Sequence, residues 1–190
     1  MQNRFLLTRK INGCALIAAF LAVPVMAAVL KTDAAKSSVG VTFKQMNVPV
    51  EAKFKKFSAK IDYDPSKPDR ASANVDIDIT SFDLGDTQYN QEVLKKEWFN
   101  AAQFPKASFV SSAMKVLAAD KLQVNGKLTI KGKTTDVSFP LTVKKDGVNQ
   151  VFDGALPIKR LAYRIGEGDW EDTSMVADEV TIKFHVVAAP

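Results

Sequence analysis

Apolar and polar positions alternate along most of the chain between residues 39 and 187. Apolar side chains occupy every second position in eight segments, which span residues 39–43, 57–63, 73–79, 107–116, 124–130, 137–143, 151–158 and 180–187. A period of two places successive side chains on opposite faces of a β-strand. Turn-rich connections such as Asp64–Pro68 separate the segments. The pattern predicts an all-β protein of about eight antiparallel strands, each with one apolar face.

Eight such strands fit either a sandwich or an up-and-down barrel. A barrel of this size is just wide enough to be filled by its own side chains or to hold one small ligand. Pro140 lies inside one predicted strand. Because proline has no backbone N–H, we expect that strand to be irregular there or to border a gap, as in an incompletely closed barrel.

One long connection has a different period. The segment DTQYNQEVLKKEWF, residues 86–99, has apolar pairs at i,i+4 spacing, Tyr89 with Val93 and Leu94 with Trp98. It predicts a short amphipathic helix over one end of the sheet, and the Asp86 side chain is a candidate N-cap. The helix is a candidate lid or portal, or a plug that closes the barrel end; the residues concerned are Leu94, Trp98 and Phe99.

The first 27 residues are typical of a secretory signal peptide. Arg4, Arg9 and Lys10 precede the apolar run 11–25, and small residues follow at the expected cleavage point after Ala27. The run is short for a membrane span. We therefore expect a mature domain over residues 28–190, exported to the periplasm.

Removal of this segment changes the chemistry of the chain. The only cysteine, Cys14, lies within it, so the mature domain would contain no thiol and no disulfide. The formal net charge falls from +5 to +2 with the loss of three basic residues. Nucleic-acid binding then lacks electrostatic support, and we expect no nucleic-acid partner.

Four segments of the mature chain, in order, resemble the YceI-like family of bacterial periplasmic polyisoprenoid-binding proteins. They begin at Phe54 (FKKFSAKIDYDPSKP), Lys95 (KKEWFNAAQFPKASFVSS), Val124 (VNGKLTIKGKTTDVSFPLTV) and Ile158 (IKRLAYRIGEGDWEDTSMVADEVTIKFHV). The resemblance implies an eight-stranded lipocalin-like barrel with an apolar cavity for an isoprenoid chain. It also implies pairing as dimers. Two histidine positions common in the family are occupied here by Gln45-Met46 and by Glu92-Val93-Leu94, so no headgroup role of those histidines transfers.

The inward-facing row is the candidate lipid-binding site. Without the resemblance, its simplest interpretation is a closed hydrophobic core; with it, a cavity is favoured. An isoprenoid lipid, such as a prenyl quinone or prenyl phosphate, would then be the ligand, with no separate cofactor and with transient contact at a membrane surface or membrane protein. The predicted lining consists of Phe43, Phe54, Phe57, Ile61, Val75, Ile77, Phe109, Leu128, Ile130, Phe139, Leu141, Phe152 and Phe184.

Two arginines are candidates for contact with a polar headgroup. The guanidinium groups of Arg160 and Arg164 could meet a quinone oxygen or a pyrophosphate near a portal. The alternative is that both are solvated charges at a strand edge. The acidic cluster Asp169, Glu171 and Asp172 matches no established calcium-loop spacing, and we expect no metal site.

The remaining polar residues give little support to catalysis. His185, the only histidine, is out of phase with the inward Phe184 and should face outward. Asp76 and Asp78 lie opposite the apolar row, where acid–base chemistry lacks a shielded pocket. We therefore expect a binding protein and not an enzyme. The alternative is a structural or interaction domain with a solid barrel.

Overall fold

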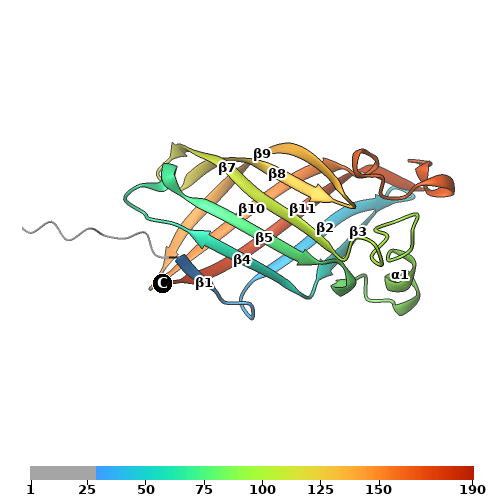
Figure 1. Ribbon diagram of the computed structural model, residues 1–190, viewed down its shortest axis with the longest axis horizontal. Coiled ribbons are helices and arrows are strands. Elements are labelled where there is room, and N and C mark those ends of the chain that lie inside the picture. Colours follow the sequence, from blue (N-terminus) through green and yellow to red (C-terminus); the bar gives the residue numbers. More distant parts are fainter. Residues whose placement is uncertain (1–28) are drawn as a thin grey trace, which may run out of the picture.

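The computed structural model describes residues 29–190, and the predicted signal peptide lies outside this range. Eleven strands form one antiparallel sheet (Figure 1). Their bounds are β1 (Val29–Thr32), β2 (Ser38–Gln45), β3 (Val48–Phe54), β4 (Phe57–Asp62), β5 (Ser72–Asp78), β6 (Phe82–Asp83), β7 (Lys106–Ala118), β8 (Lys121–Ile130), β9 (Lys133–Asp146), β10 (Asn149–Lys159) and β11 (Val176–Ala189).

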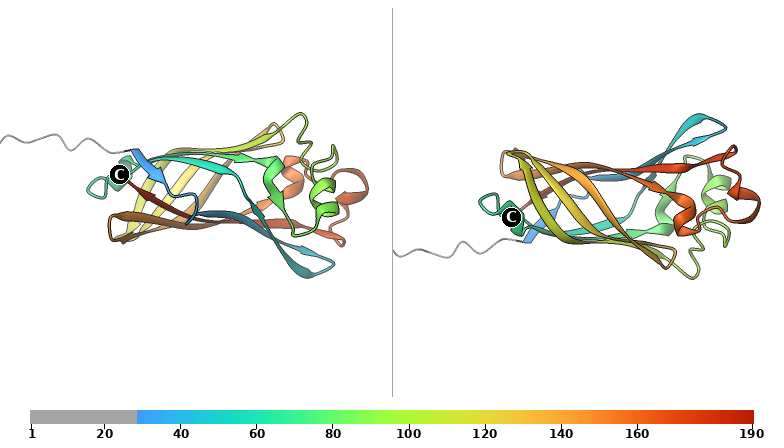
Figure 2. Two further views of the ribbon diagram at one scale, coloured as in Figure 1. Left: turned by 90° about the horizontal axis from the view of Figure 1, so that it is seen from below. Right: turned by 90° about the horizontal axis from the view of Figure 1, so that it is seen from above.

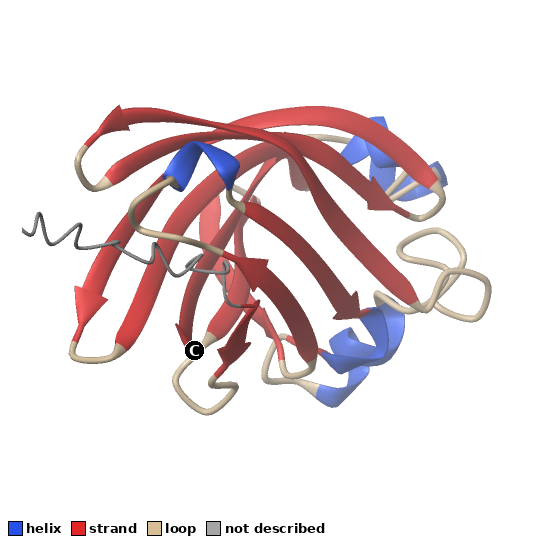
Figure 3. Cartoon of the chain, turned by 60° about the vertical axis from the view of Figure 1, so that its left-hand side comes forward, coloured by secondary structure: helices blue, strands red, loops and turns tan. Residues whose placement is uncertain are grey.

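Eight of these strands close into a barrel. They follow one another in the order β1-β4-β5-β7-β8-β9-β10-β11, and β1 pairs back with β11. The long strands wind around a common interior (Figure 3). The predicted fold class, an all-β, eight-stranded antiparallel barrel, is confirmed. Closure leaves few sheet edges unpaired, which is how barrels avoid edge-to-edge association.

Three strands were absent from the sequence-based expectation. β1 has four residues and β6 has two, too few to show a period. β3 contains Pro49, and the alternating Val48 and Val50 are not buried. It pairs only with β2 and β6, so the β2–β3 hairpin projects beyond the ring at one end of the barrel (Figure 2).

The sheet has a gap beside Pro140, as predicted. β9 pairs with β10 only from Asp146 and Asn149 to Leu141 and Gly154, and Pro140 is the next residue along β9. The segment 133–140 keeps its partner on the other side, β8. The 3₁₀ helix η3 (Arg160–Tyr163) contacts β9 here, and the buried Tyr163 hydroxyl hydrogen-bonds to the Thr135 hydroxyl. A side-chain bond therefore bridges the place where the ladder stops.

The described residues contain one α-helix, α1 (Thr87–Glu92), at the end of the barrel where the β2–β3 hairpin projects (Figure 1). The Asp86 carboxylate accepts the backbone N–H groups of Gln88 and Tyr89, as predicted for an N-cap. The helix is shorter than the expected 86–99. After Glu92 the chain folds into successive turns, in which Phe99 N–H donates to the Val93 carbonyl.

The other short helices are 3₁₀ segments. They are η1 (Pro68–Arg70), η2 (Ile79–Ser81) and η4 (Gly168–Glu171), besides η3. Within residues 29–190, no helix combines the length and the apolar character needed to cross a bilayer.

Candidate functional site

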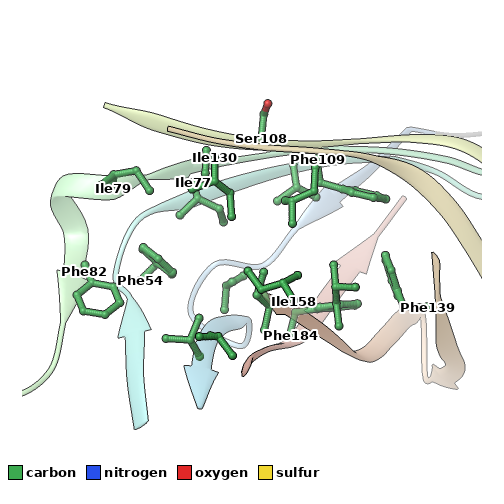
Figure 4. A pocket seen from close by; sticks show the side chains of 18 of the residues that line it. Phe54, Ile77, Ile79, Phe82, Ser108, Phe109, Ile130, Phe139, Ile158 and Phe184 are labelled. Carbon is green, nitrogen blue, oxygen red and sulfur yellow. The ribbon is translucent and has the colours of Figure 1, made fainter. Parts of the chain in front are cut away.

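The barrel encloses a cavity of about 240 Å³ that runs between its two ends. On the same measure, about 10–15 Å³ is enough for one water molecule. The wall is almost entirely aliphatic and aromatic, and its side chains converge on the interior (Figure 4). The predicted residues found in the wall are Phe43, Phe54, Ile61, Val75, Ile77, Phe109, Leu128, Ile130, Phe139, Leu141, Phe152 and Phe184.

Phe57 is the one predicted lining residue that the structure does not place in the wall. It shares the inward parity of Ala59 and Ile61, but it begins β4 directly after the bend that follows β3. There its half-buried side chain packs against the core cluster. The two-residue period predicts on which face of a strand a side chain lies. The position of that side chain along the barrel axis depends instead on where the strand starts.

Three phenylalanines form a contiguous aromatic row inside the barrel. The ring centroids of Phe109 and Phe139 are 5.5 Å apart, and those of Phe139 and Phe184 are also 5.5 Å apart. Two of the rings lie on glycines: a Cβ at Gly126 would be 2.5 Å from Phe109, and one at Gly154 would be 2.2 Å from Phe184. The missing side chains let these rings lie along the wall, which leaves the middle of the barrel open.

The segment that contains α1 covers one end of the cavity. Trp98 and Phe99, two of the three predicted lid residues, line the cavity, whereas Leu94 does not. Phe99 packs against Phe54 and Phe82, with ring centroids 6.3 Å and 5.5 Å away. Tyr89 lines the cavity and is nevertheless 59% exposed, so the cavity opens to solvent beside α1.

Arg160 corrects a prediction made from the sequence. It is 2% exposed, and all five of its guanidinium N–H groups donate to backbone carbonyls. Burial lowers the pKa of this guanidinium, and the nearby carboxylates of Asp178 and Glu171 oppose the shift. Arg160 is therefore neither a solvated edge charge nor a free headgroup ligand. The accepting carbonyls belong to Ile165, Gly166, Trp170, Val176 and Ala177.

These five bonds organise the loop between η3 and β11. Gly166 has a φ of +78°, and a Cβ there would be 2.2 Å from Nη1 of Arg160, so glycine is required. The Arg160 guanidinium carbon lies 5.9 Å from the centroid of the Trp98 ring. The guanidinium thus fixes the loop through its hydrogen bonds, and its positive charge faces an aromatic ring at the cavity mouth.

Arg164, the other predicted headgroup residue, lies outside the cavity wall and is exposed. Its carbonyl accepts a hydrogen bond from the Lys131 ammonium. The Lys131 side chain is only 6% exposed and is paired with Glu167 at 2.9 Å, and this pairing lowers the pKa of the Glu167 carboxyl. Sequence analysis missed this contact, since Lys131 resembles any lysine in a polar turn.

The remaining candidates lie away from the cavity wall. His185 faces outward, as predicted, with Nδ1 2.6 Å from Asp153 Oδ1 across β10 and β11. Asp76 is exposed near Lys106, and the Asp78 carboxylate accepts the N–H of Thr80. Asp172, from the acidic loop, accepts the N–H of Ser174. Within residues 29–190, no group of three or more acidic, histidine or cysteine side chains is arranged to hold a metal ion.

Comparison with known sequences identifies the family. The profile of the YceI-like domain matches residues 30–188. The chain belongs to the YceI-like family. A UPF0312 protein of Shewanella sp. (strain W3-18-1) is 30% identical to this YceI-like chain over 143 residues, which cover 72% of each sequence.

Solved structures share the YceI-like fold. Burkholderia cenocepacia BcnA is 55% identical, with a TM-score of 0.82, and the match covers 84% of this chain and 100% of BcnA. A Campylobacter jejuni YceI protein has 21% identity and a TM-score of 0.69 over 74% of this chain and 85% of its own. A polyisoprenoid binding domain from Saccharophagus degradans, described as implicated in plant cell wall breakdown, has 18% identity and a TM-score of 0.69 over 85% and 99%.

Proposed function

We propose that this protein binds the chain of a polyisoprenoid lipid inside its barrel and carries or sequesters it in the periplasm, without making or breaking a bond. The observation that carries the proposal is the continuous apolar cavity. Membership of the YceI-like family supports it, as does the polyisoprenoid-binding neighbour. The periplasmic location rests on the signal-like residues 1–27.

The wall suits a chain that has no polar atoms. The binding free energy then comes from the apolar surface that is removed from water, at roughly 25 cal/mol per Å² before entropic losses. Such a contact distinguishes ligands by the width and length of their chains and hardly by their functional groups. We therefore expect prenyl chains of similar width to compete with one another for the cavity.

Mass spectrometry of the purified mature protein tests the proposal. Gentle purification followed by solvent extraction should release a lipid with isoprenoid mass increments. Delipidated protein should retain added prenyl quinone and melt at a higher temperature, since a ligand that binds only the folded state stabilises it. Absence of copurifying lipid, together with neither retention nor a thermal shift, would overturn the proposal.

A substitution inside the cavity separates binding from stability. In Leu128→Trp the added volume enters the cavity, so we expect lost lipid retention with a small change in unfolding free energy. A packed interior would instead lose about 1–3 kcal/mol. Lys127→Trp, on the exposed face of the same strand, is the matched control and should retain lipid.

The alternative of a solid interaction barrel predicted an interior filled by its own side chains. The cavity of about 240 Å³ contradicts that premise. The cavity therefore favours lipid binding as the proposed function.

We further propose that the protein exchanges lipid while its open end rests on a membrane surface. An insoluble chain must leave a bilayer, and an apolar rim lies beside the cavity mouth. Met46 and Val48, at the tip of the β2–β3 hairpin, are each 62% exposed, and Met175 is 43% exposed. Met46 N–H donates to the Met175 carbonyl, which joins the two parts of the rim.

Met46 offers a variant that separates membrane contact from folding. It has a φ of +47° in a two-residue turn with Asn47, a conformation that asparagine tolerates better than methionine. Met46→Asn should therefore keep the hairpin intact and weaken cosedimentation with lipid vesicles. Val148→Asn removes a 77% exposed apolar residue from the β9–β10 turn at the other end of the barrel and should leave vesicle binding unchanged. Equal effects of the two variants would contradict docking by this rim.

A further inference from the structure

The cavity has a polar end. The lining side chains that carry polar atoms gather mainly where α1, the β2–β3 hairpin and the loop before β11 meet. Elsewhere in the wall they are Tyr63 and Ser108, and the Ser108 hydroxyl points away from the cavity (Figure 4). A polar group on a bound chain therefore finds most of its possible partners at this end. The residues of this polar end are Gln45, Tyr89, Glu92, Trp98, Arg160 and Trp170.

The indole of Trp98 is the unusual group at this end. Its Nε1 is buried, has almost no accessible surface and has no hydrogen-bond partner among residues 29–190, so a ligand oxygen reaches it only after a small shift of the indole ring or its neighbours. Its ring lies 5.2 Å from the ring of Trp170 and 5.9 Å from the Arg160 guanidinium carbon, so it is held between two neighbours. A buried N–H without an acceptor is unfavourable, and native proteins rarely leave one.

The hydrogen-bonding groups that surround this N–H favour an uncharged partner. All five Arg160 donors are already bonded to backbone carbonyls, so none remains for a phosphate. The partly exposed Glu92 carboxylate lines the same end and forms an ion pair with the exposed Lys95. A phosphate buried here would meet the Arg160 charge but no free guanidinium donor, only one neutral donor and a nearby carboxylate, and these would not offset its loss of hydration.

We propose that the Trp98 indole N–H donates a hydrogen bond to an uncharged oxygen at the head of the bound isoprenoid, a carbonyl or hydroxyl oxygen. The inference rests on the proposed function and makes it more specific. The head lies at the α1 end of the cavity, and the chain runs towards Tyr63 and Phe152 at the other end. Trp98 thus orients the ligand and selects neutral heads over anionic ones.

Ligands of matched chain length test this selectivity. Delipidated protein should bind a prenyl quinone or a prenyl alcohol more tightly than the corresponding prenyl hydrocarbon, and a prenyl diphosphate most weakly. Trp98→Phe keeps an aromatic ring but removes the N–H. It should weaken quinone and alcohol binding by roughly three- to tenfold, the range of one hydrogen bond. Hydrocarbon binding should not change.

Trp170→Phe is the matched control, because Trp170 lies in the same aromatic pair and also lines the cavity. It should preserve the preference for an oxygen-bearing head. If Trp98→Phe weakens hydrocarbon and quinone binding equally, or if the diphosphate binds best to the native protein, the inference is wrong.

Proton–nitrogen NMR gives a direct second measurement. The chain contains two tryptophans and therefore two indole N–H signals, and Trp98→Phe identifies one of them. That signal should move downfield with the quinone and stay in place with the hydrocarbon. No movement with any oxygen-bearing ligand that binds would overturn the hydrogen bond. Failure of every prenyl compound to bind, the hydrocarbon included, would instead overturn the proposed function.

Discussion

At the residue scale, the open space inside the barrel depends on the positions of glycines as much as on the positions of large side chains. Phe184 lies over Gly154, its direct partner on the neighbouring strand, and Phe109 lies over Gly126. Aromatic side chains that fold over strand glycines remain along the sheet. Two of the largest side chains of the wall thus occupy little of the open space.

Gly154→Ala tests this arrangement. The new Cβ would be 2.2 Å from Phe184 Cζ, so the ring must turn into the cavity. We expect weaker lipid retention and a loss of about 0.5–1.5 kcal/mol in unfolding free energy, the cost of holding the Phe184 ring away from its preferred rotamer. Retention assays and urea denaturation measure the two effects. Unchanged retention would show that the ring position does not control the cavity.

Arg160→Lys tests the five carbonyl contacts. A lysine ammonium has three donors and no planar fork, so at least two carbonyls would lose their partner. At about 1–3 kcal/mol for each unsatisfied group, we expect a loss of about 2–6 kcal/mol in urea denaturation. A loss below 1 kcal/mol would contradict the structural role assigned to Arg160.

At the element scale, two junctions depend on side chains where the sheet alone does not suffice. η3 bridges the gap beside Pro140 through Tyr163 and Thr135. The α1 segment is tied to β6 by Asn90, whose Nδ2 donates to the Asp83 carboxylate and whose Oδ1 accepts the Leu84 N–H.

Tyr163→Phe should cost about 0.5–1.5 kcal/mol, the net value of one hydrogen bond. Thr135→Val should cost a similar amount, and the double variant should cost less than the sum of the two, since both remove the same bond. Urea denaturation of the four proteins measures the coupling. Strict additivity would mean that the two hydroxyls do not interact.

The attachment of α1 should survive mild acid. Hydrogen bonds from Lys55 and Asn90 hold the pKa of the Asp83 carboxyl well below its usual range. A carboxyl with a lowered pKa contributes stability that is present above its unfolded pKa of about 3.9 and is lost as pH falls through the folded value. Tryptophan emission, which reports on Trp98 and on the neighbouring Trp170, should therefore stay constant from pH 7 to pH 4. Asp83→Asn should change this emission at pH 7, and a change in the native protein near pH 5 would contradict the assignment.

How much the sequence predicts differs with the element concerned. Alternation predicts the wall well, since a side chain at Leu128 or Phe139 must face inward once neighbouring strands pair. The hydrogen bonds of Arg160 and Lys131 could not be predicted, because their acceptors are backbone carbonyls whose positions depend on loop conformation. The helix length was overestimated for a related reason: i,i+4 pairs also occur where the chain folds into turns.

At the scale of the whole molecule, the barrel has two unlike ends. At the cavity mouth, Arg160 fixes the loop before β11. At the same end of the barrel, the β2–β3 hairpin extends past the ring of strands (Figure 2). Most of the polar lining groups lie at this end, whereas Tyr63 is the polar lining residue at the opposite end. This asymmetry gives a bound chain a preferred direction. Association with a second copy of the chain stays a prediction, which sedimentation of the lipid-loaded protein would check.

The barrel contains no cysteine, because Cys14 lies ahead of the described residues. Main-chain ladders and buried side chains alone hold the ring closed, so its folding is independent of redox conditions. Dithiothreitol should leave the melting temperature of residues 28–190 unchanged, and protein produced under reducing conditions should melt like protein produced under oxidising conditions. If the proposed export takes place, maturation would need no thiol oxidoreductase.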